Sequence, residues 1–288
     1  MIVVAWWSGG VTSAVACKLA IDLFGVDNTR IIMIDTFNEH EDTYRFKKDC
    51  EVWYGKEIET ITGIGDKYHS IEDVWRKRKS LNTATGAICS TELKRYVREK
   101  WEKSNYFDVQ VFGFEFESNE FKRSKSMKLN NPTSLFPLLM YGLTKKECIE
   151  IIQRKNIEVP VMYSLGFHNN NCFKTGCVQG GIGYWQKIQR EFPDKFDNMA
   201  AIEHELTDLK GEPVTMLKDQ SNDSKTKDKK EQLLFLKKHK DYPNVLCLAD
   251  KPIREVKPLF ECNGFCGVND LAERSSTENE INYKKLNP

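Results

Sequence analysis

The chain has 288 residues, and its 43 basic side chains almost balance its 42 acidic ones, which gives a formal charge of +1. Such a chain has no strong net field, so it is not a general binder of polyanions. With 40% apolar and 11% aromatic residues it can build a real core. Disorder and collagen-like repetition are therefore excluded, and the length predicts about two domains.

No segment predicts a membrane span or an export signal. The longest apolar runs, residues 1–7 and 135–141, are far shorter than the about 18 to 20 residues that cross a bilayer, and the first residues lack the cationic start of a signal peptide. Nine cysteines are an odd number in a chain of this length, which argues for thiols in a reducing compartment. We therefore expect a soluble, cytoplasmic protein without a membrane partner.

The first half alternates buried strand patterns with helical patterns, which is typical of a parallel sheet with helices on both faces. Strands are predicted at residues 2–7, 30–34 and 57–61. Helices are predicted at residues 12–24, 41–54 and 71–78. Further along, we expect a charged helix at 91–103 and strands at 109–113 and 134–139. The fold class predicted is α/β, with a Rossmann-like parallel sheet.

The second half differs in composition. A helix at 144–155 begins at a capping-box pattern, Thr144 with Glu147. Residues 159–183 contain Pro160, five glycines and three asparagines in a row, so we expect them to be ordered by something other than a large core. Helices follow at 184–190 and 194–209, and a polar surface loop at 218–230. We divide the chain into an α/β domain, 1–158, and a Cys/Gly-rich segment with a helical C-terminal region that packs on it, 159–288.

A glycine turn joins the first strand to the first helix. It offers backbone N–H groups, hydroxyls and the positive end of a helix dipole to a phosphate, although no Gly-Lys-Ser/Thr of a Walker P-loop follows. The candidate phosphate-binding residues are Ser8, Gly9, Gly10, Thr12 and Ser13.

Several separated stretches together resemble the PP-loop adenine-nucleotide alpha-hydrolase superfamily, whose signature is Ser-Gly-Gly-x-Asp-Ser. Within it, the likeness is to the phosphoadenosine phosphosulfate (PAPS) reductase-like proteins common in phages and bacterial mobile elements. The matching stretches are residues 5–14, 34–36, 39–42, 89–94, 109–113, 143–145 and 169–185. The resemblance implies an adenine nucleotide alpha hydrolase-like sandwich in residues 1–158. It also implies an adenine-nucleotide ligand, ATP or PAPS, with Mg²⁺ as a candidate metal.

One departure from the signature is Thr12, which stands where the superfamily has an aspartate. The second strand should deliver Asp35 and Thr36 to the same sheet edge, and the resemblance places this stretch near adenosine or metal. As an alternative, Asp35 caps the next turn. Glu39 and Asp42 fit the acidic start of a helix.

Four more residues are candidates for nucleotide contact. Gly113 ends a buried strand and leaves room for a close approach, and Lys94 follows Cys89 on a charged helix. Glu120 and Arg123 lie in a segment that resembles a Glu/Arg stretch of PAPS reductases near phosphate or sulfate.

Three cysteines lie in connections over the expected ligand edge: Cys89, Cys172 and Cys177. They suit an iron-sulfur cluster, with structural zinc or unliganded thiols as alternatives, and the resemblance favours the cluster. Cys172 and Cys177 are therefore also candidates for catalysis. Four others occupy apolar patterns where cysteine is usually a small buried hydrophobe: Cys17, Cys50, Cys148 and Cys247.

Cys262 and Cys266 close a Gly-punctuated tail that loosely resembles the nucleophilic cysteine segment of sulfonucleotide reductases. They are candidates for a catalytic nucleophile, and a structural or metal-binding pair is the alternative.

Three functional hypotheses follow. In the first, an enzyme binds ATP, activates an acceptor and passes sulfur to it through a cysteine-bound cluster, and the acceptor is a nucleic-acid base or backbone. In the second, a sulfonucleotide reductase attacks PAPS or adenylylsulfate with a C-terminal thiolate. In the third, a nucleotide- or cluster-binding protein acts without turnover. The pattern does not set an oligomeric state.

Overall fold

The computed structural model describes residues 1–83, 86–219 and 232–259. Its centre is a five-stranded sheet in the order β3-β2-β1-β6-β7, and every pairing in it is parallel. The strands are β1 (Val3–Trp7), β2 (Thr29–Ile34), β3 (Glu59–Ile61), β6 (Val109–Val111) and β7 (Ser134–Leu135). The predicted Rossmann-like α/β fold is confirmed.

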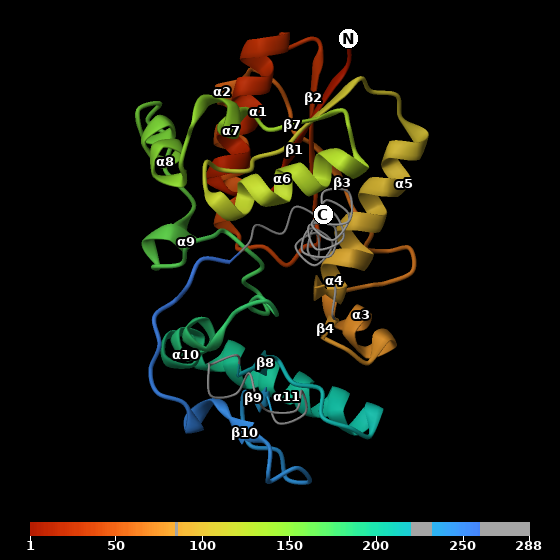
Figure 1. The fold of residues 1–288 in the computed structure, drawn as a ribbon, viewed down its shortest axis with the longest axis vertical. Helices are drawn as coiled ribbons and strands as arrows, with labels where there is room; N and C mark the ends of the chain where they lie inside the picture. Colours follow the sequence, from red (N-terminus) through yellow and green to blue (C-terminus); the bar gives the residue numbers. More distant parts are fainter. Residues whose placement is uncertain (84–85, 220–231, 260–288) are drawn as a thin grey trace, which may run out of the picture.

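Helices cover both faces of this sheet, as Figure 1 shows. Along β1, Val3, Ala5 and Trp7 pack in one apolar cluster, while Val4 and Trp6 pack in another. The first face is covered by α1 (Val11–Phe24), α2 (Asp42–Tyr54) and α8 (Lys145–Gln153). The second is covered by α5 (Tyr96–Ser104) and α6 (Ser118–Asn130). Because successive side chains of a strand point to opposite faces, a central strand needs the near-continuous apolar run seen here.

Two predicted elements differ in detail from the structure. The helix expected at 91–103 extends over α4 (Ile88–Ser90), a π-helical turn (Thr91–Arg95) and α5. The strand expected at 134–139 ends at Leu135, because Pro137 opens the short helix α7 (Pro137–Tyr141). The capping box of Thr144 and Glu147 at the start of α8 is confirmed.

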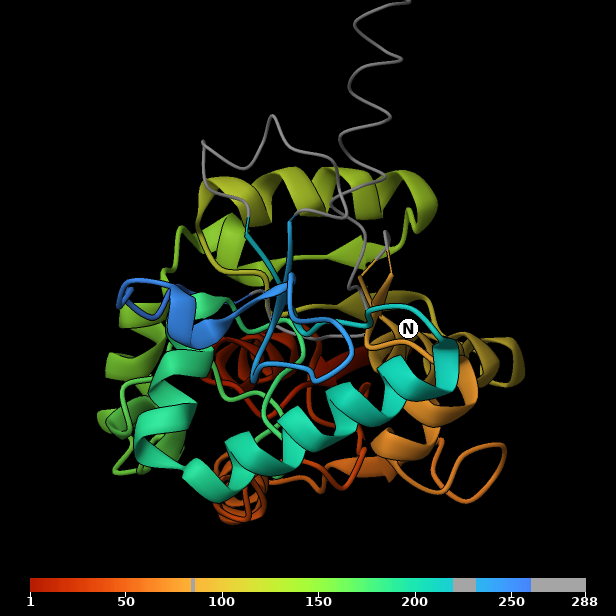
Figure 2. The same cartoon turned by 90° about the horizontal axis from the view of Figure 1, so that it is seen from below.

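A second apolar core lies below the sheet in Figure 1. It is built by α10 (Ile182–Glu191), α11 (Pro193–Lys210) and a small sheet in the order β10-β9-β8. In Figure 2 the long helix α11 lies across this end of the molecule. The strands of the small sheet are β8 (Leu217–Lys218), β9 (Leu233–Phe235) and β10 (Leu246–Cys247).

The second core also takes in helices from earlier in the chain. They are α3 (Ile71–Arg78) and α9 (Val161–Ser164), with the strand pair β4 (Asn82–Thr83) and β5 (Gly86–Ala87) beside them. Apolar side chains from residues 68–93 and from residues 162–248 therefore share one cluster. The division at residue 158 stays a prediction.

The segment 159–183 was expected to lack a large core, and this was wrong. Its side chains Met162, Phe167, Phe173 and Val178 are buried in the second core. Within the described ranges, no helix is both long and apolar enough to cross a bilayer. The predicted loop 218–230, beyond Asp219, and the tail with Cys262 and Cys266 lie outside those ranges.

A buried carboxyl joins α11 to the small sheet. Glu203 is fully buried, and its two oxygens accept the backbone N–H groups of Met216 and Leu236. Burial raises the pKa of Glu203 to about 8, against the lowering effect of those two hydrogen bonds. The folded state therefore holds a proton that the unfolded chain releases near pH 4.5.

A raised pKa in the folded state makes stability fall with pH between the two pKa values. The contribution of Glu203 is fully present below about pH 4.5 and is lost as the pH rises through about 8. We predict that the Tm of the wild type falls by several degrees between about pH 5 and 8, and that Glu203→Gln removes this part of the decline. Glu205→Gln, on an exposed side chain of the same helix, should keep it. Equal pH profiles for the wild type and Glu203→Gln in thermal unfolding would contradict the assignment.

Candidate functional site

The strand order reverses at β1, because β2 lies on one side of it and β6 on the other. Ligands of open parallel sheets bind outside the carboxyl ends of the strands at such a reversal. The residues that follow β1 at this point are Ser8, Gly9 and Gly10, and α1 begins directly after them. The topology thus places the predicted glycine turn at the expected ligand edge.

The turn is held by its own hydroxyl groups. The Ser13 Oγ accepts the Ser8 N–H at 3.1 Å, lies 2.9 Å from the Ser8 Oγ and donates to the Gly10 carbonyl at 2.8 Å. Gly9 has φ 88°, a conformation that favours glycine, and a Cβ there would lie 2.9 Å from Cγ2 of Thr43. No side chain caps the first turn of α1, and no acidic residue lies in it. Apart from the Val11 N–H, which donates to the Tyr163 hydroxyl, the N–H groups of this first turn and the helix dipole are therefore available to an anion.

Residues of the segment 159–183 also form hydrogen bonds with this turn. The Asn170 Nδ2 donates to the Gly9 carbonyl at 2.8 Å and to Thr43 Oγ1 at 3.0 Å. The hydroxyl of Tyr163 accepts the Val11 N–H at 3.2 Å. Sequence reasoning missed both contacts. The three consecutive asparagines were the signal, but their partners are more than a hundred residues away.

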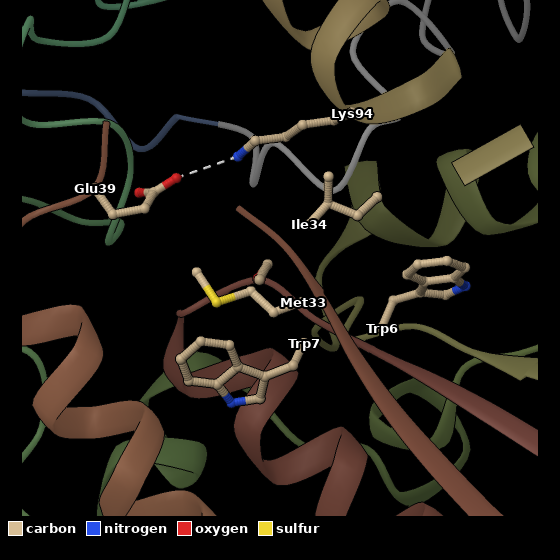
Figure 3. Close-up of a pocket in the computed structure, with 7 residues that line it drawn as sticks. Trp6, Trp7, Met33, Ile34, Glu39 and Lys94 are labelled. Atoms are coloured by element: carbon tan, nitrogen blue, oxygen red, sulfur yellow. Dashed lines mark hydrogen bonds and ion pairs between the residues drawn. The ribbon is translucent and has the colours of Figure 1, made fainter. Parts of the chain in front are cut away.

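A narrow pocket opens beside the turn (Figure 3). Its lining residues come from the ends of β1 and β2, the loop after β2 and the π-helical turn: Trp6, Trp7, Ser8, Met33, Ile34, Glu39 and Lys94. Glu39 and Lys94 are both buried, and their charged atoms lie 3.4 Å apart. The Sγ of Cys172 lies 3.9 Å from the Glu39 Oε1. One carboxylate thus contacts both Lys94 and the cysteine segment, in a pocket that Ser8 of the glycine turn also lines.

This placement corrects one expectation and agrees with another. Glu39 is not part of a solvated helix start: it precedes α2 and points to Lys94, as Figure 3 shows. Asp42 does lie in the first turn of α2. Lys94 belongs to a π-helical turn, a rare feature that is frequent at functional sites.

The end of β2 carries the two residues predicted there. Both are buried, and Asp35 Oδ1 accepts the Phe37 N–H at 2.7 Å and the Tyr44 hydroxyl at 3.0 Å. Asp35 therefore caps its own turn, which was the alternative left open. The hydroxyl of Thr36, like that of Thr12, is buried without a hydrogen-bond partner among the described residues. Burial, together with the negative charges of Asp35 and Glu39, holds the pKa of Tyr44 well above its usual value.

Three candidates have structural roles away from the pocket lining. At Gly113, a Cβ would lie 2.6 Å from Cα of Ser13, so glycine is needed there for the sheet to pack against the start of α1. Glu120 and Arg123 form a buried ion pair on α6, and the Arg123 guanidinium lies 4.6 Å from the ring centre of Phe114. A nucleotide contact for these three residues stays a prediction.

The three candidate cysteines border the second core. Cys89 and Cys172 are half-buried and Cys177 is buried. Among the described residues, only Asp208, His239 and Asp241 bring three potential metal-ligand atoms within 4.8 Å of one another, so the three sulfur atoms are spread more widely than this. Zn–S bonds of 2.3 Å in a tetrahedron would need sulfur atoms about 3.8 Å apart. The four cysteines predicted to be apolar core residues are confirmed as buried: Cys17, Cys50, Cys148 and Cys247.

Comparisons with known proteins find likeness at low identity. No protein-family model matches the chain. An uncharacterized protein of Methanocaldococcus jannaschii is 26% identical over 207 residues, which are 67% of this chain and 40% of that protein. The chain therefore spans less than half the length of this curated relative.

Two solved structures show a low structural similarity to this chain. The PAPS reductase of Candida auris, in a phosphate complex, has a TM-score of 0.44 and 13% identity over 60% of this chain and 82% of that one. The U34-tRNA thiolase NcsA of Methanococcus maripaludis, with its 4Fe-4S cluster, has a TM-score of 0.32 and 14% identity over 71% of this chain and 72% of that one. At these identities the likeness concerns the fold alone.

The geometry of the glycine turn makes a direct prediction. Gly9→Ala adds a Cβ that meets Thr43 and displaces the turn, so adenine-nucleotide affinity should fall at least tenfold, about 1.4 kcal/mol. Gly55→Ala is the matched control, because Gly55 has φ 64° and no atom within 4 Å of the added Cβ. Both variants introduce the strain of a left-handed alanine, about 1–2 kcal/mol. Calorimetry with ATP and with PAPS should separate them, and equal affinity in Gly9→Ala and the wild type would refute the phosphate site.

Proposed function

We propose that the chain is an enzyme of PP-loop type that binds ATP, activates an acceptor at its α-phosphate and replaces an acceptor oxygen by sulfur. The observation that carries this proposal is that the Glu39 carboxylate reaches both Lys94 and Cys172 in the pocket that begins at Ser8. A phosphate-binding turn, a buried cation and a thiol therefore lie within one small volume.

Two features bind the polyphosphate in this proposal: the glycine turn with the start of α1, and the ammonium of Lys94. The uncapped N-terminus of α1 supplies N–H groups and a positive dipole end to phosphate oxygens. Lys94 supplies a full positive charge in a buried setting, where it stabilises the charge that develops on the leaving pyrophosphate. Glu39 holds this ammonium in place until the nucleotide competes for it.

The apolar part of the pocket suits the adenine ring. Trp7, Met33 and Ile34 line it beside the turn, as Figure 3 shows. Such a surface binds a flat base through burial and stacking, while the polar groups at the other end set the orientation of the phosphates.

The proposed reaction has two displacements. An acceptor carbonyl oxygen attacks the α-phosphorus of ATP, the bond to the β-phosphate oxygen breaks, and pyrophosphate leaves. Hydrosulfide then attacks the acceptor carbon, the carbon–oxygen bond breaks, and AMP leaves with that oxygen. The sum consumes ATP and hydrosulfide and gives the thio-substituted acceptor, AMP and pyrophosphate, without a net redox change.

The cysteines fit an iron-sulfur cluster better than a zinc ion. The set offers thiolates, which are the ligands such clusters prefer, and the sulfur spacing is wider than one zinc ion requires. Cys89, Cys172 and Cys177 would hold the cluster, which would supply a binding position for sulfur. The surrounding apolar side chains limit its contact with water.

A sulfonucleotide reductase is the second candidate, because the first turn of α1 has Thr12 and no carboxylate that could hold a metal. In this case a cysteine thiolate attacks the sulfur of PAPS and the sulfur–oxygen bond breaks. Adenosine bisphosphate leaves, and the enzyme keeps a thiosulfonate on that cysteine.

One set of assays tests both candidates on protein purified without oxygen. We predict AMP and pyrophosphate from ATP only when hydrosulfide and an acceptor are present, with unfractionated nucleic acid as the first acceptor. Cys172→Ser should lower this turnover at least a hundredfold and reduce bound iron. Cys148→Ala is the matched control, because Cys148 is buried in the other core, on α8. With a dithiol added to reduce the thiosulfonate, sulfite from PAPS without AMP from ATP would instead establish the reductase, and neither product would refute both.

A further inference from the structure

We propose that the asparagine segment carries a second site, for a small and weakly hydrated anion, next to the candidate cluster cysteines. A cavity between this segment and the C-terminal strap, defined here as residues 251–259, is lined by Asn169 and Asn171. The cavity has about 10 Å³ open to the centre of a water-sized sphere, which is room for about one such group. Asn170, between these two residues, binds the phosphate turn instead.

Two amide groups in this cavity are donors that lack acceptors. Asn169 and Asn171 are 4% and 8% exposed, and within residues 1–83, 86–219 and 232–259 the Nδ2 atom of each has no hydrogen-bond partner. The orientation of Asn169 is fixed, because its Oδ1 accepts the Leu259 N–H at 2.9 Å. Leaving a buried donor unpaired costs about 1–3 kcal/mol. Two such donors at one cavity indicate a ligand with acceptor character.

The charges around the cavity favour an anion over a neutral ligand. Among the described residues, its lining includes Lys257 and His168 but no carboxylate. The ring Nε2 of His168 lies 3.0 Å from the Val256 carbonyl, so the strap keeps this histidine at the rim. An uncharged water would satisfy the two amides, whereas an anion would also be attracted by the positive charge of Lys257 at the exposed rim.

The apolar lining of the cavity and its small size favour some anions over others. Phe167 and Leu259 give the cavity an apolar side, which penalises strongly hydrated ions such as fluoride. The same apolar walls penalise phosphate and sulfate, which are also strongly hydrated. The ligand class that remains is a small, soft, monovalent anion, either a heavier halide or hydrosulfide.

The position relative to the cysteines favours hydrosulfide, an assignment that rests on the proposed sulfur transfer. Cys172 directly follows Asn171. Tyr184 also lines the cavity, and its hydroxyl accepts the Cys177 N–H at 3.0 Å. The cavity is thus lined by residues that adjoin or contact both cysteines. It would store the sulfur nucleophile next to its point of use.

The test measures the chloride NMR line width of the full-length protein, with sodium hydrosulfide, bromide and fluoride as competitors. We expect the protein to broaden the chloride signal, and hydrosulfide and bromide to reverse this broadening at concentrations at least tenfold lower than fluoride. Asn169→Asp keeps the acceptor for the Leu259 N–H and replaces the donor by a repelling carboxylate, so anion affinity should fall at least tenfold. Asn171→Leu removes the other donor at similar volume and should have the same effect if the aspartate variant fails to fold. Asn198→Asp, exposed on α11, is the control that should change nothing.

The outcomes separate this site from the proposed function. Equal broadening in the wild type and both cavity variants, or no broadening at all, would overturn the anion site and leave a buried water as the occupant. Competition by bromide without hydrosulfide would overturn the hydrosulfide assignment. Hydrosulfide binding that is lost in the cavity variants, in a protein that forms no AMP, would uphold the site and refute the sulfur transfer.

Discussion

The hydrogen bond from the side chain of Asn170 to the Gly9 carbonyl connects the two halves of this molecule at the point where the chemistry is proposed. Its donor belongs to a segment that packs on the second core, and its acceptor follows the central strand of the parallel sheet. Both groups are buried, so losing either would leave the other without a partner in a dry environment. The conformation of the turn is therefore a property of the whole fold.

A buried ion pair imposes the second constraint. Glu39 lies in the loop after β2, and Lys94 lies in the π-helical turn before α5. Each charge would be costly to bury without the other. Their pairing brings the loop after β2 and the π-helical turn to one place, and Cys172 reaches the same carboxylate. A polyphosphate that attracts Lys94 would weaken its bond to Glu39. If the pocket binds a nucleotide as proposed, that binding is coupled electrostatically to the neighbourhood of the thiol.

Much of the fold, including the position of the glycine turn, could be predicted from the sequence, because strand and helix periodicity and the Ser8–Gly10 turn are local signals. Residues 2–7 form a continuous apolar run, and burial on both faces of a central strand requires such a run. Thr144 with Glu147 fixed a helix start through atoms three residues apart. These signals depend only on neighbours in the sequence.

The remaining parts depend on contacts between distant residues. The burial of Glu39 depends on Lys94, which lies 55 residues away. The sequence predicted that Gly113 leaves room for a ligand, whereas the backbone of Ser13 occupies the space beside its Cα. The segment 159–183, rich in glycine and asparagine, also contains apolar residues that only tertiary packing brings into a core. Composition alone could not show which of its asparagines would meet the glycine turn.

The bond between Asn170 and Gly9 also has a consequence for local unfolding. Proteins open in cooperative units whose stabilities differ, and the second core is a separate apolar cluster from those that flank the sheet. If α10, α11 and the small sheet melt first, the asparagine segment detaches and the turn loses its outer support while the sheet stays folded. Ligand affinity would then be lost at a lower denaturant concentration than the one that unfolds the parallel sheet. A bound nucleotide would in turn stabilise helices that it does not contact.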